Sequence, residues 1–363
     1  MFEIIFLIVL CGYFIQSVIF VIGAAIKFPK LKNDELPTAT VVVAARNEEE
    51  NILRCLTSLN MLKYPEGKLE IILVDDKSTD NTGKIIDEFI AGNNKFKKIV
   101  TKKEIGMLKG KTNALANAIE IAKGEIILTT DADCEVHPLW AKTTASYYQK
   151  DIGAVNGFTT QEAANGFSGM QAIDFIYLLT VASGTINLKK PISCIGNNMS
   201  YRKKAYEEVG GYQNLPFSVT EDFNLLFAIY KLDKYRIILP SDPDTLITSK
   251  PCTNFKSLYR QKKRWSVGGL SVPFRGYIVM AWGFLTNIGI LLTPLFFSPV
   301  WLYLAVFKIT IDFFVLYPVH KQLGIVKNLK YFLYFQIYYT LYVIAIPFVL
   351  AASRKVVWKG REY

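Results

Sequence analysis

The sequence predicts an α/β domain with a mostly parallel sheet, flanked at both ends by transmembrane helices. Apolar residues make up 51% of the chain and charged residues only 20%, and the apolar residues are concentrated towards the two ends. Between those ends, short β-branched runs alternate with helical segments, which is typical of a parallel sheet. The 363 residues are enough for one large domain or two ordinary ones.

The first apolar segment is predicted to be a retained membrane span. Residues 4–26 carry no charge, and Lys27, Lys30 and Lys32 follow them directly. A signal peptide is the alternative, but the apolar run exceeds the usual h-region and no basic n-region precedes it. We therefore expect residues 1–36 to form a transmembrane helix and a basic linker, with the basic flank inside the cell.

The last part of the chain, residues 276–363, is predicted to hold further transmembrane helices. The candidate spans are 277–297, 300–317 and 331–351, and Lys308 and Asp312 in the second could pair at i, i+4. Four spans place both termini outside if the large domain is cytoplasmic. The basic tail favours the inside instead, so the topology stays open. Its basic residues are Arg354, Lys355, Lys359 and Arg361.

Composition narrows the possible functions. The net charge is +11, and the basic residues between positions 250 and 275 lie just before an apolar run, without an acidic residue among them. This placement favours a membrane surface or a phosphate ligand over nucleic acid, which we do not expect as a partner. The five cysteines form no Cys-x-x-Cys pair, which argues against a zinc site or a disulfide framework. With two histidines in the chain, acid–base chemistry falls to carboxylates.

Residues 37–275 are predicted to form the α/β domain. Strands are expected at Thr40–Ala45, Glu70–Val74 and Glu125–Thr130, and a helix at Lys111–Lys123. A polar cluster follows each strand, and ligands of such sheets gather at the carboxyl ends of the strands. Phe167–Ile186 is an apolar stretch inside this domain, and it fits either a core helix or an amphipathic helix on the membrane surface.

Two acidic motifs follow the second and third strands. Asp75-Asp76 begins a turn whose Ser, Thr and Asp residues could cap a helix, and its carboxylates could also accept from a base or a ribose. Asp131-Ala132-Asp133 can direct two carboxylates at one Mg²⁺ or Mn²⁺ ion beside substrate phosphates. Its position after an apolar strand favours that function over a solvated loop.

Two further motifs have both a structural and a functional interpretation. Thr220-Glu221-Asp222 could be a helix start with Thr220 as the N-cap, or it could supply a general base. The segment 261–265, Gln-Lys-Lys-Arg-Trp, could be a basic patch with an interfacial tryptophan. It could equally offer Arg264 to a phosphate and Trp265 to a sugar face.

In this order and spacing, the motifs resemble those of membrane-bound family 2 glycosyltransferases, a group that includes cellulose, hyaluronan and poly-N-acetylglucosamine synthases and ceramide glucosyltransferase. The resemblance covers roughly residues 38–265. It also includes Ala44-Ala45-Arg46-Asn47-Glu48, the Lys111 segment and Gly196-Asn197-Asn198. It implies a GT-A fold, a nucleotide-sugar donor, a divalent metal, and a glycan or lipid acceptor at the membrane bilayer.

The resemblance also implies roles for individual residues. Asp222 would be the base, Asp133 the metal ligand, Arg264 a diphosphate contact and Trp265 the acceptor platform, with Gln261 beside them in a substrate-binding role. The remaining substrate-binding residues would line the nucleoside pocket or meet the donor diphosphate and sugar: Ala45, Asn47, Glu48, Asp75, Lys111 and Asp131.

The acceptor and the number of transfers stay open. The intact Gln-x-x-Arg-Trp motif favours a growing glycan, whereas the short region after it favours a lipid or short-chain acceptor. We expect a multi-pass protein of the cell membrane with its catalytic domain in the cytoplasm. A catalytically silent scaffold and a nucleotidyltransferase are the competing classes. The first would lack the carboxylates that this chain has, and the second has no use for Gln-x-x-Arg-Trp.

Overall fold

The computed structural model describes residues 2–101, 104–216, 218, 220–296, 298–358 and 361–362. These residues form two compact units. The α/β unit comprises residues 27–160 and 194–250, and the helical unit comprises 2–26, 161–193 and the described residues from 251 onwards. Phe297 and Lys359, which belong to the expected spans and tail, lie outside the described residues.

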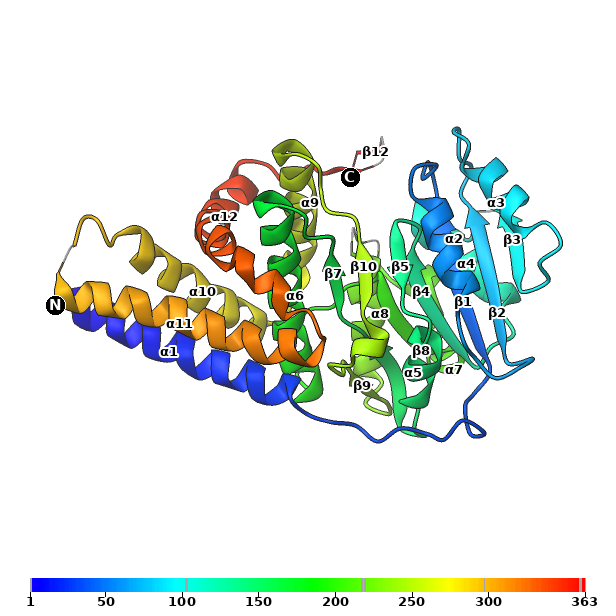
Figure 1. Cartoon of the computed structure of the whole chain (residues 1–363), viewed down its shortest axis with the longest axis horizontal. Coiled ribbons are helices and arrows are strands. Elements are labelled where there is room, and N and C mark those ends of the chain that lie inside the picture. Colours follow the sequence, from blue (N-terminus) through cyan, green and yellow to red (C-terminus); the bar gives the residue numbers. More distant parts are fainter. Residues whose placement is uncertain are drawn as a thin grey trace. The chain divides into compact units, whose positions relative to one another are not determined.

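A seven-stranded mixed sheet forms the centre of the α/β unit (Figure 1). Its strand order is β3-β2-β1-β4-β8-β6-β9, with β8 antiparallel to its neighbours β4 and β6 and the other pairs parallel. The strands are β1 (Ala39–Ala45), β2 (Leu69–Asp75), β3 (Phe96–Val100), β4 (Ile126–Asp131), β6 (Ile152–Asn156), β8 (Asn198–Arg202) and β9 (Arg236–Ile238). The predicted α/β class with a mostly parallel sheet is confirmed.

Helices cover this sheet, and a small second sheet adjoins it. The order β5-β10-β7 forms the second sheet, from β5 (Cys134–Val136), β10 (Ile247–Ser249) and β7 (Thr159–Gln161). The helical segments are α2 (Ile52–Asn60), α3 (Thr82–Ile90), α4 (Gly110–Ile121), α5 (Trp140–Ser146), α7 (Lys203–Glu208), α8 (Glu221–Lys231), η1 (Tyr212–Asn214) and η2 (Pro243–Thr245).

The core of this unit follows from alternation along β1. Val41, Val43 and Ala45 belong to one apolar cluster together with Ile52 and Leu56 of α2. Successive strand residues point to opposite faces, so the residues between them face α4, which packs on β1 and β2. A strand buried on both faces reads as a continuous apolar run, as Thr40–Ala45 does.

The helical unit contains five helices long and apolar enough to cross a membrane, judged by length and composition of the described residues. They are α1 (Phe2–Ala24), α6 (Gly166–Asn187), α10 (Phe274–Leu291), α11 (Pro299–Gln322) and α12 (Phe332–Ala352), the last preceded by η4 (Val326–Tyr331). Helix α9 (Phe255–Gly268) and η3 (Gly269–Ser271) precede α10, and the pair β11 (Val357–Trp358) and β12 (Arg361–Glu362) follows α12.

Helix α6 decides between the two interpretations of the apolar stretch inside the predicted domain. Its span window is 94% buried, and it packs against α1, α11 and α12 (Figure 1). A helix buried on every side offers no face to solvent or to a membrane surface, and it belongs inside a bundle. The stretch is therefore a buried helix, as the core-helix interpretation expects, but it belongs to the helical unit and not to the predicted α/β domain.

The predicted pairing of Lys308 with Asp312 is confirmed. Lys308 Nζ lies 2.8 Å from Asp312 Oδ2, and both side chains are 0% exposed. Lys308 also donates to Asn287 and Gln336, and Tyr13 donates to Asp312. These hydrogen bonds join α1, α10, α11 and α12, so both Lys308 and Asp312 have several partners, as burial in an apolar medium requires.

Candidate active site

The loops after β1 and β2 are joined by a network of hydrogen bonds at the carboxyl ends of these strands. Asn47 adopts a left-handed backbone conformation with φ 53°, and its side-chain oxygen accepts from the backbone N–H of Thr79 at 2.8 Å. Glu48 N donates to Thr82 Oγ1 at 2.8 Å. The two loops thus form one connected edge of the sheet. The Asn47 side chain holds the loop after β2 in place through its hydrogen bond to Thr79.

Asp75 lies at the end of β2 within this edge. Its Oδ1 accepts from the backbone N–H of Ser78 at 2.9 Å, and the carboxylate is almost fully buried. A Cβ atom added at Gly83 would lie 2.6 Å from Asp75 Oδ2, so the start of α3 is shaped around this carboxylate. Ala45, at the end of β1, is also buried. The residues predicted for the nucleoside pocket are therefore gathered at one edge.

The helix start predicted after Asp75 is present, but the N-cap residue of α3, Asn81, makes no side-chain capping hydrogen bond. Asp80 Oδ1 accepts from Thr82 N at 3.0 Å at the start of α3. Burial by itself would raise the pKa of Asp80, but hydrogen bonds from the side chain and backbone of Thr82 outweigh it, and the pKa lies below its usual value. The hydrogen bond at the start of α3 is therefore accepted by Asp80 and not by Asp75 or Asp76.

Lys111 at the start of α4 links β4 to α8. Its Nζ lies 2.5 Å from Asp131 Oδ1 and 3.8 Å from Glu221 Oε1. Burial alone would lower the pKa of Lys111, but the carboxylates of Asp131 and Glu221, with that of Asp222, hold it above its usual value. Lys111 is therefore a permanent cation held among acidic groups.

Asp133 follows β4 and faces further negative charge. Burial, and then the carboxylates of Asp131 and Glu48, raise the pKa of Asp133 to about 6. The thiol of Cys134 donates to Asp133 Oδ1 at 3.3 Å. Among the described residues, no three His, Cys, Asp or Glu side chains form a group that would hold a metal ion by themselves. Asp133 and Asp131 suit a cation that takes its remaining ligands from a substrate.

Asp222 lies in the first turn of α8. This helix begins at Glu221, as predicted, but the Thr220 side chain makes no capping hydrogen bond and instead bonds Ser218 at 3.1 Å. Thr220 is therefore the N-cap residue, as predicted, although its side chain makes no capping hydrogen bond. Asp222 Oδ1 accepts from the Phe223 N–H at 2.9 Å. A Cβ at Gly196 would lie 2.7 Å from Asp222 Cβ, so only glycine at position 196 leaves room for this carboxylate.

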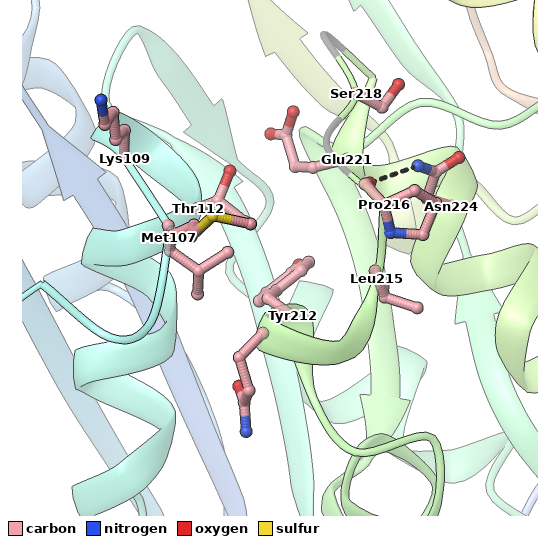
Figure 2. Close-up of a pocket in the computed structure, with 11 residues that line it drawn as sticks. Met107, Lys109, Thr112, Tyr212, Leu215, Pro216, Ser218, Glu221 and Asn224 are labelled. Carbon is pink, nitrogen blue, oxygen red and sulfur yellow. Dashed lines mark hydrogen bonds between the residues drawn. The ribbon is translucent and has the colours of Figure 1, made fainter.

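A pocket of about 80 Å³ opens beside Glu221 (Figure 2). Figure 2 shows Glu221 reaching from α8 towards Thr112 of α4, with Tyr212 between the two sides. Asn224 Nδ2 donates to the Pro216 carbonyl at 3.0 Å and fixes one wall. Glu221 therefore lies between the Lys111 ammonium and this pocket, which its side chain helps to line.

Gln261, Arg264 and Trp265 lie on α9 of the helical unit. An Asn254–Ser257 capping box starts this helix, and Lys262 of the same motif forms an ion pair with Asp174 of α6. The carboxylate motifs all belong to the α/β unit. The predicted site residues after β1, β2 and β4 therefore lie in the same unit as Lys111 and Asp222. The Gln-x-x-Arg-Trp residues lie on a helix of the other unit.

Three residues next to the predicted site residues had no individual role predicted from the sequence: Glu221, Gly196 and Cys134. Glu221 and Cys134 each adjoin a predicted residue, and Gly196 begins the Gly-Asn-Asn segment noted in the resemblance. Asn198 of that segment accepts from Trp140 and donates to the carbonyls of Phe158 and Thr245. The Asn198 side chain therefore organises the interior, and Gly196 of the same segment borders Asp222.

Comparison with known proteins agrees with this geometry. The model of glycosyl transferase family 2 matches residues 40–210, and that of glycosyl transferase family group 2 matches residues 126–351. A mannosyltransferase from Pyrobaculum calidifontis, solved with GDP-mannose and Mn²⁺, superposes with a TM-score of 0.60 at 16% identity, over 93% of this chain and 99% of that one. This similarity confirms the GT-A fold.

The curated relatives include proteins named as lipid glycosyltransferases and proteins named as polysaccharide synthases. The chain is 29% identical to the beta-monoglucosyldiacylglycerol synthase of Nostoc sp., over 64% of this chain and 49% of that protein. It is 27% identical to the poly-beta-1,6-N-acetyl-D-glucosamine synthase of Staphylococcus epidermidis, over 68% of this chain and 58% of that one. The chain spans about half the length of these relatives. Since the second family model covers more than half of the chain, the protein belongs to the family 2 glycosyltransferases.

Proposed function

We propose that this chain is a membrane-embedded, inverting glycosyltransferase that moves one sugar from a nucleoside diphosphate donor to a lipid-linked acceptor. The observation that carries the proposal is the position of Lys111, held between Asp131 and Glu221 at the end of β4. A leaving diphosphate needs a fixed cation, and an attacking hydroxyl needs a nearby carboxylate. The cluster offers both within one unit.

The metal role falls to Asp133, with Asp131 as a donor contact beside it. The mutually repelling carboxylates of Asp133, Asp131 and Glu48 favour a divalent cation. Mg²⁺ is commonly bound by one or two carboxylates together with substrate phosphates, so three protein ligands are not required. When bound, Mg²⁺ or Mn²⁺ would offset the negative charge that develops on the leaving diphosphate. Lys111, which is paired with Asp131, would offset the rest.

Asp222 is the proposed general base. The acceptor hydroxyl would form a new bond to the anomeric carbon as the bond from that carbon to the diphosphate breaks, and its proton would pass to the Asp222 carboxylate. Attack opposite the leaving group inverts the anomeric configuration in a single step. Gly196 would keep the carboxylate in place, because it leaves space that a larger residue would fill.

The nucleoside would bind at the edge formed by the loops after β1 and β2. Asp75 and Glu48 would accept hydrogen bonds from the base or ribose, and the Ala45 backbone would line the pocket. The network around Asn47 prepares this edge before the donor arrives, which lowers the cost of ordering loops on binding. UDP is the proposed nucleotide.

The acceptor end is assigned to α9. Arg264 would meet the diphosphate, Gln261 would bind beside it, and Trp265 would stack on the acceptor sugar or headgroup. The centre of the helical unit favours a lipid acceptor over a long glycan. Lys308 and Asp312 are 0% exposed there, so side chains fill the space that a passing polysaccharide would need. The similarity to a glucosyldiacylglycerol synthase supports the same choice.

The proposed location is the cell membrane, with the α/β unit in the cytoplasm. Four of the apolar helices, α1, α10, α11 and α12, correspond to the spans expected from the sequence, and they expose many large apolar side chains. The lysines directly after α1 favour the cytoplasmic side for the unit that follows.

An assay with the purified full chain in detergent tests the proposal. Mn²⁺, a panel of UDP- and GDP-sugars, and either diacylglycerol or a short glycan would be supplied. We expect one sugar to be added to the lipid, with the inverted anomeric configuration seen by NMR. Absence of any nucleotide-sugar turnover would contradict the proposed function, whereas a ladder of lengthening products would contradict single addition and favour a polysaccharide synthase.

Site variants make the assay specific. Asp133→Asn and Asp222→Asn should each reduce transfer by about 100-fold or more, with the unfolding temperature retained. The exposed Asp151 provides a matched control, since Asp151→Asn removes the same charge from the same unit. Rates near wild type in either site variant would remove that residue from the mechanism.

A further inference from the structure

Asp174 of α6 and Lys262 of α9 form a buried ion pair within the helical unit. The two residues are 4% and 6% exposed. Tyr338 of α12 donates a further hydrogen bond to Asp174 Oδ2 at 3.5 Å. Burying two charges is costly, and a pair of apolar residues is often at least as stabilising. The pair therefore calls for an explanation beyond holding two helices together.

The Lys262 ammonium faces the Trp265 ring as well as Asp174. It lies 4.4 Å from the Trp265 ring centroid and 5.4 Å from the Tyr342 ring centroid. Lys262 and Trp265 are three residues apart on α9, the spacing at which side chains of a helix meet. Attraction between a cation and an indole face is strongest where water is excluded, as it is around Lys262.

The residue after Asp174 holds the same tryptophan from a second direction. Phe175 packs edge-on against Trp265, with ring centroids 5.2 Å apart and an interplanar angle of 73°. Consecutive residues of α6 thus fix the Lys262 cation and the indole itself. Trp265 nevertheless remains partly exposed, so its ring is oriented without being enclosed.

The rest of α9 is anchored so that this orientation is kept. Gln171 of α6 forms two hydrogen bonds with the backbone of Cys252, at 2.9 and 3.1 Å, just before α9 begins. At the other end, Ser266 and the Tyr342 hydroxyl lie 3.2 Å apart. With both ends held, the ion pair determines the rotation of the indole rather than the position of the whole helix.

We infer that Asp174 and Lys262 are positioning residues that orient Trp265 as a platform for the acceptor. The inference rests on the proposed function, which gives Trp265 that role. Asp174 fixes the Lys262 ammonium, the ammonium and Phe175 fix the indole plane, and the exposed part of the ring is presented ready for stacking. A platform oriented in advance avoids the cost of ordering a large side chain when the acceptor binds.

The test replaces the pair by apolar residues of similar size, Asp174→Leu with Lys262→Met, so that no single charge is left buried. The matched control is Lys308→Met with Asp312→Leu. This second buried pair lies in the same unit and bonds Asn287, Gln336 and Tyr13. Lys262→Arg serves as the conservative variant, since it keeps the cation beside Trp265.

The first readout does not depend on activity. The five tryptophans would be labelled with 5-fluorotryptophan, and Trp265→Phe would assign the Trp265 resonance in the ¹⁹F NMR spectrum of the full chain in detergent. We expect this resonance to shift and broaden in the Asp174/Lys262 double variant and to stay in place in the control and in Lys262→Arg. An unchanged resonance in the folded double variant would overturn the inference, even if the wild type proves to have no transferase activity.

The second readout is kinetic. The double variant should raise the acceptor KM about fivefold to tenfold, the cost expected for ordering one large side chain, and change the donor KM less. The control double variant should change neither the acceptor KM nor the donor KM. If the resonance moves but the acceptor KM does not, Trp265 is not the acceptor platform and the inference fails. If no nucleotide sugar is turned over at all, the proposed function fails separately.

Discussion

The ammonium of Lys111 lies 2.5 Å from Asp131 Oδ1, which ties the first turn of α4 to the last residue of β4. The same ammonium faces Glu221 of α8 at 3.8 Å. Two consecutive elements, α4 and β4, and the distant α8 thus meet at one cation. Because the Lys111 side chain is only 20% exposed, its effect on neighbouring charges is larger than that of a fully solvated surface lysine.

Lys111→Met should therefore reduce kcat/KM for the donor by about 100-fold or more, since the diphosphate would meet repelling carboxylates instead of a cation. Steady-state kinetics at saturating Mn²⁺ measure this. Lys123→Met, which removes an exposed lysine just beyond the same helix, is the control and should leave kcat/KM unchanged. Equal rates in the two variants would show that Lys111 contributes only to folding.

Gly196→Ala should lower kcat more than it lowers stability. The added methyl group would come within 2.7 Å of Asp222 Cβ and 2.8 Å of its Oδ2, so the carboxylate must move. A displacement of a general base by even part of an ångström costs about tenfold or more in rate. Gly283→Ala, at a helical glycine whose added Cβ meets no atom within 4 Å, is the control. A Gly196→Ala enzyme with normal kcat would show that the Asp222 position is not critical.

The sequence predicted the parts of the fold that depend on local pattern. The ends of the strands predicted at Thr40–Ala45 and Glu70–Val74 are within one residue of the ends of β1 and β2. Short, continuous apolar runs rich in β-branched residues are typical of strands that are buried on both faces. The antiparallel position of β8 beside β4 could not be predicted, since strand order is set by contacts distant in sequence. The surroundings of α6 could not be predicted either, because a mostly apolar helix can pack in a protein core or in a membrane bundle.

The site was predictable to a similar degree. Asp131 and Asp133 are recognisable because a strand end fixes where their carboxylates go. The positions of Glu221 and Gly196 matter because Glu221 meets Lys111 of α4 and Gly196 meets Asp222 of α8. These contacts join segments distant in sequence, so the local pattern of residues does not predict them. Thr220 occupies the predicted N-cap position, but its hydroxyl bonds Ser218 instead of capping α8, a choice that propensity does not resolve.

Asp242 should make the α/β unit less stable in acid. Burial by itself would raise the pKa of Asp242, but hydrogen bonds from Lys30, Tyr147 and the Asp244 N–H outweigh it and hold the pKa below its usual value. A carboxyl whose pKa is lower in the folded state stabilises the fold above its unfolded pKa, near 4, and loses this effect as the pH falls through the folded pKa.

Asp242→Asn should accordingly lower the unfolding free energy by about 1–2 kcal/mol at pH 7 and by progressively less below about pH 4. Thermal unfolding in detergent across this pH range measures the difference. Tyr147→Phe should give most of the effect, because its hydroxyl donates at 2.6 Å, whereas the Lys30 side chain is 45% exposed and screened by water. A difference that does not depend on pH would exclude Asp242 as its source.

Lys308→Met alone should destabilise the helical unit strongly, by about 3–5 kcal/mol, because it leaves the Asp312 carboxylate buried without its cation. Adding Asp312→Leu should restore most of this loss, since the two charges are then removed together. The measurement is the midpoint of unfolding of each variant in a denaturing detergent, followed by circular dichroism. Additive losses in the double variant would mean that the two side chains are not coupled, contrary to their 2.8 Å separation and complete burial. Because neither residue adjoins the carboxylates of the α/β unit in sequence or belongs to that unit, donor kcat/KM measured on the folded fraction should stay near the wild-type value throughout.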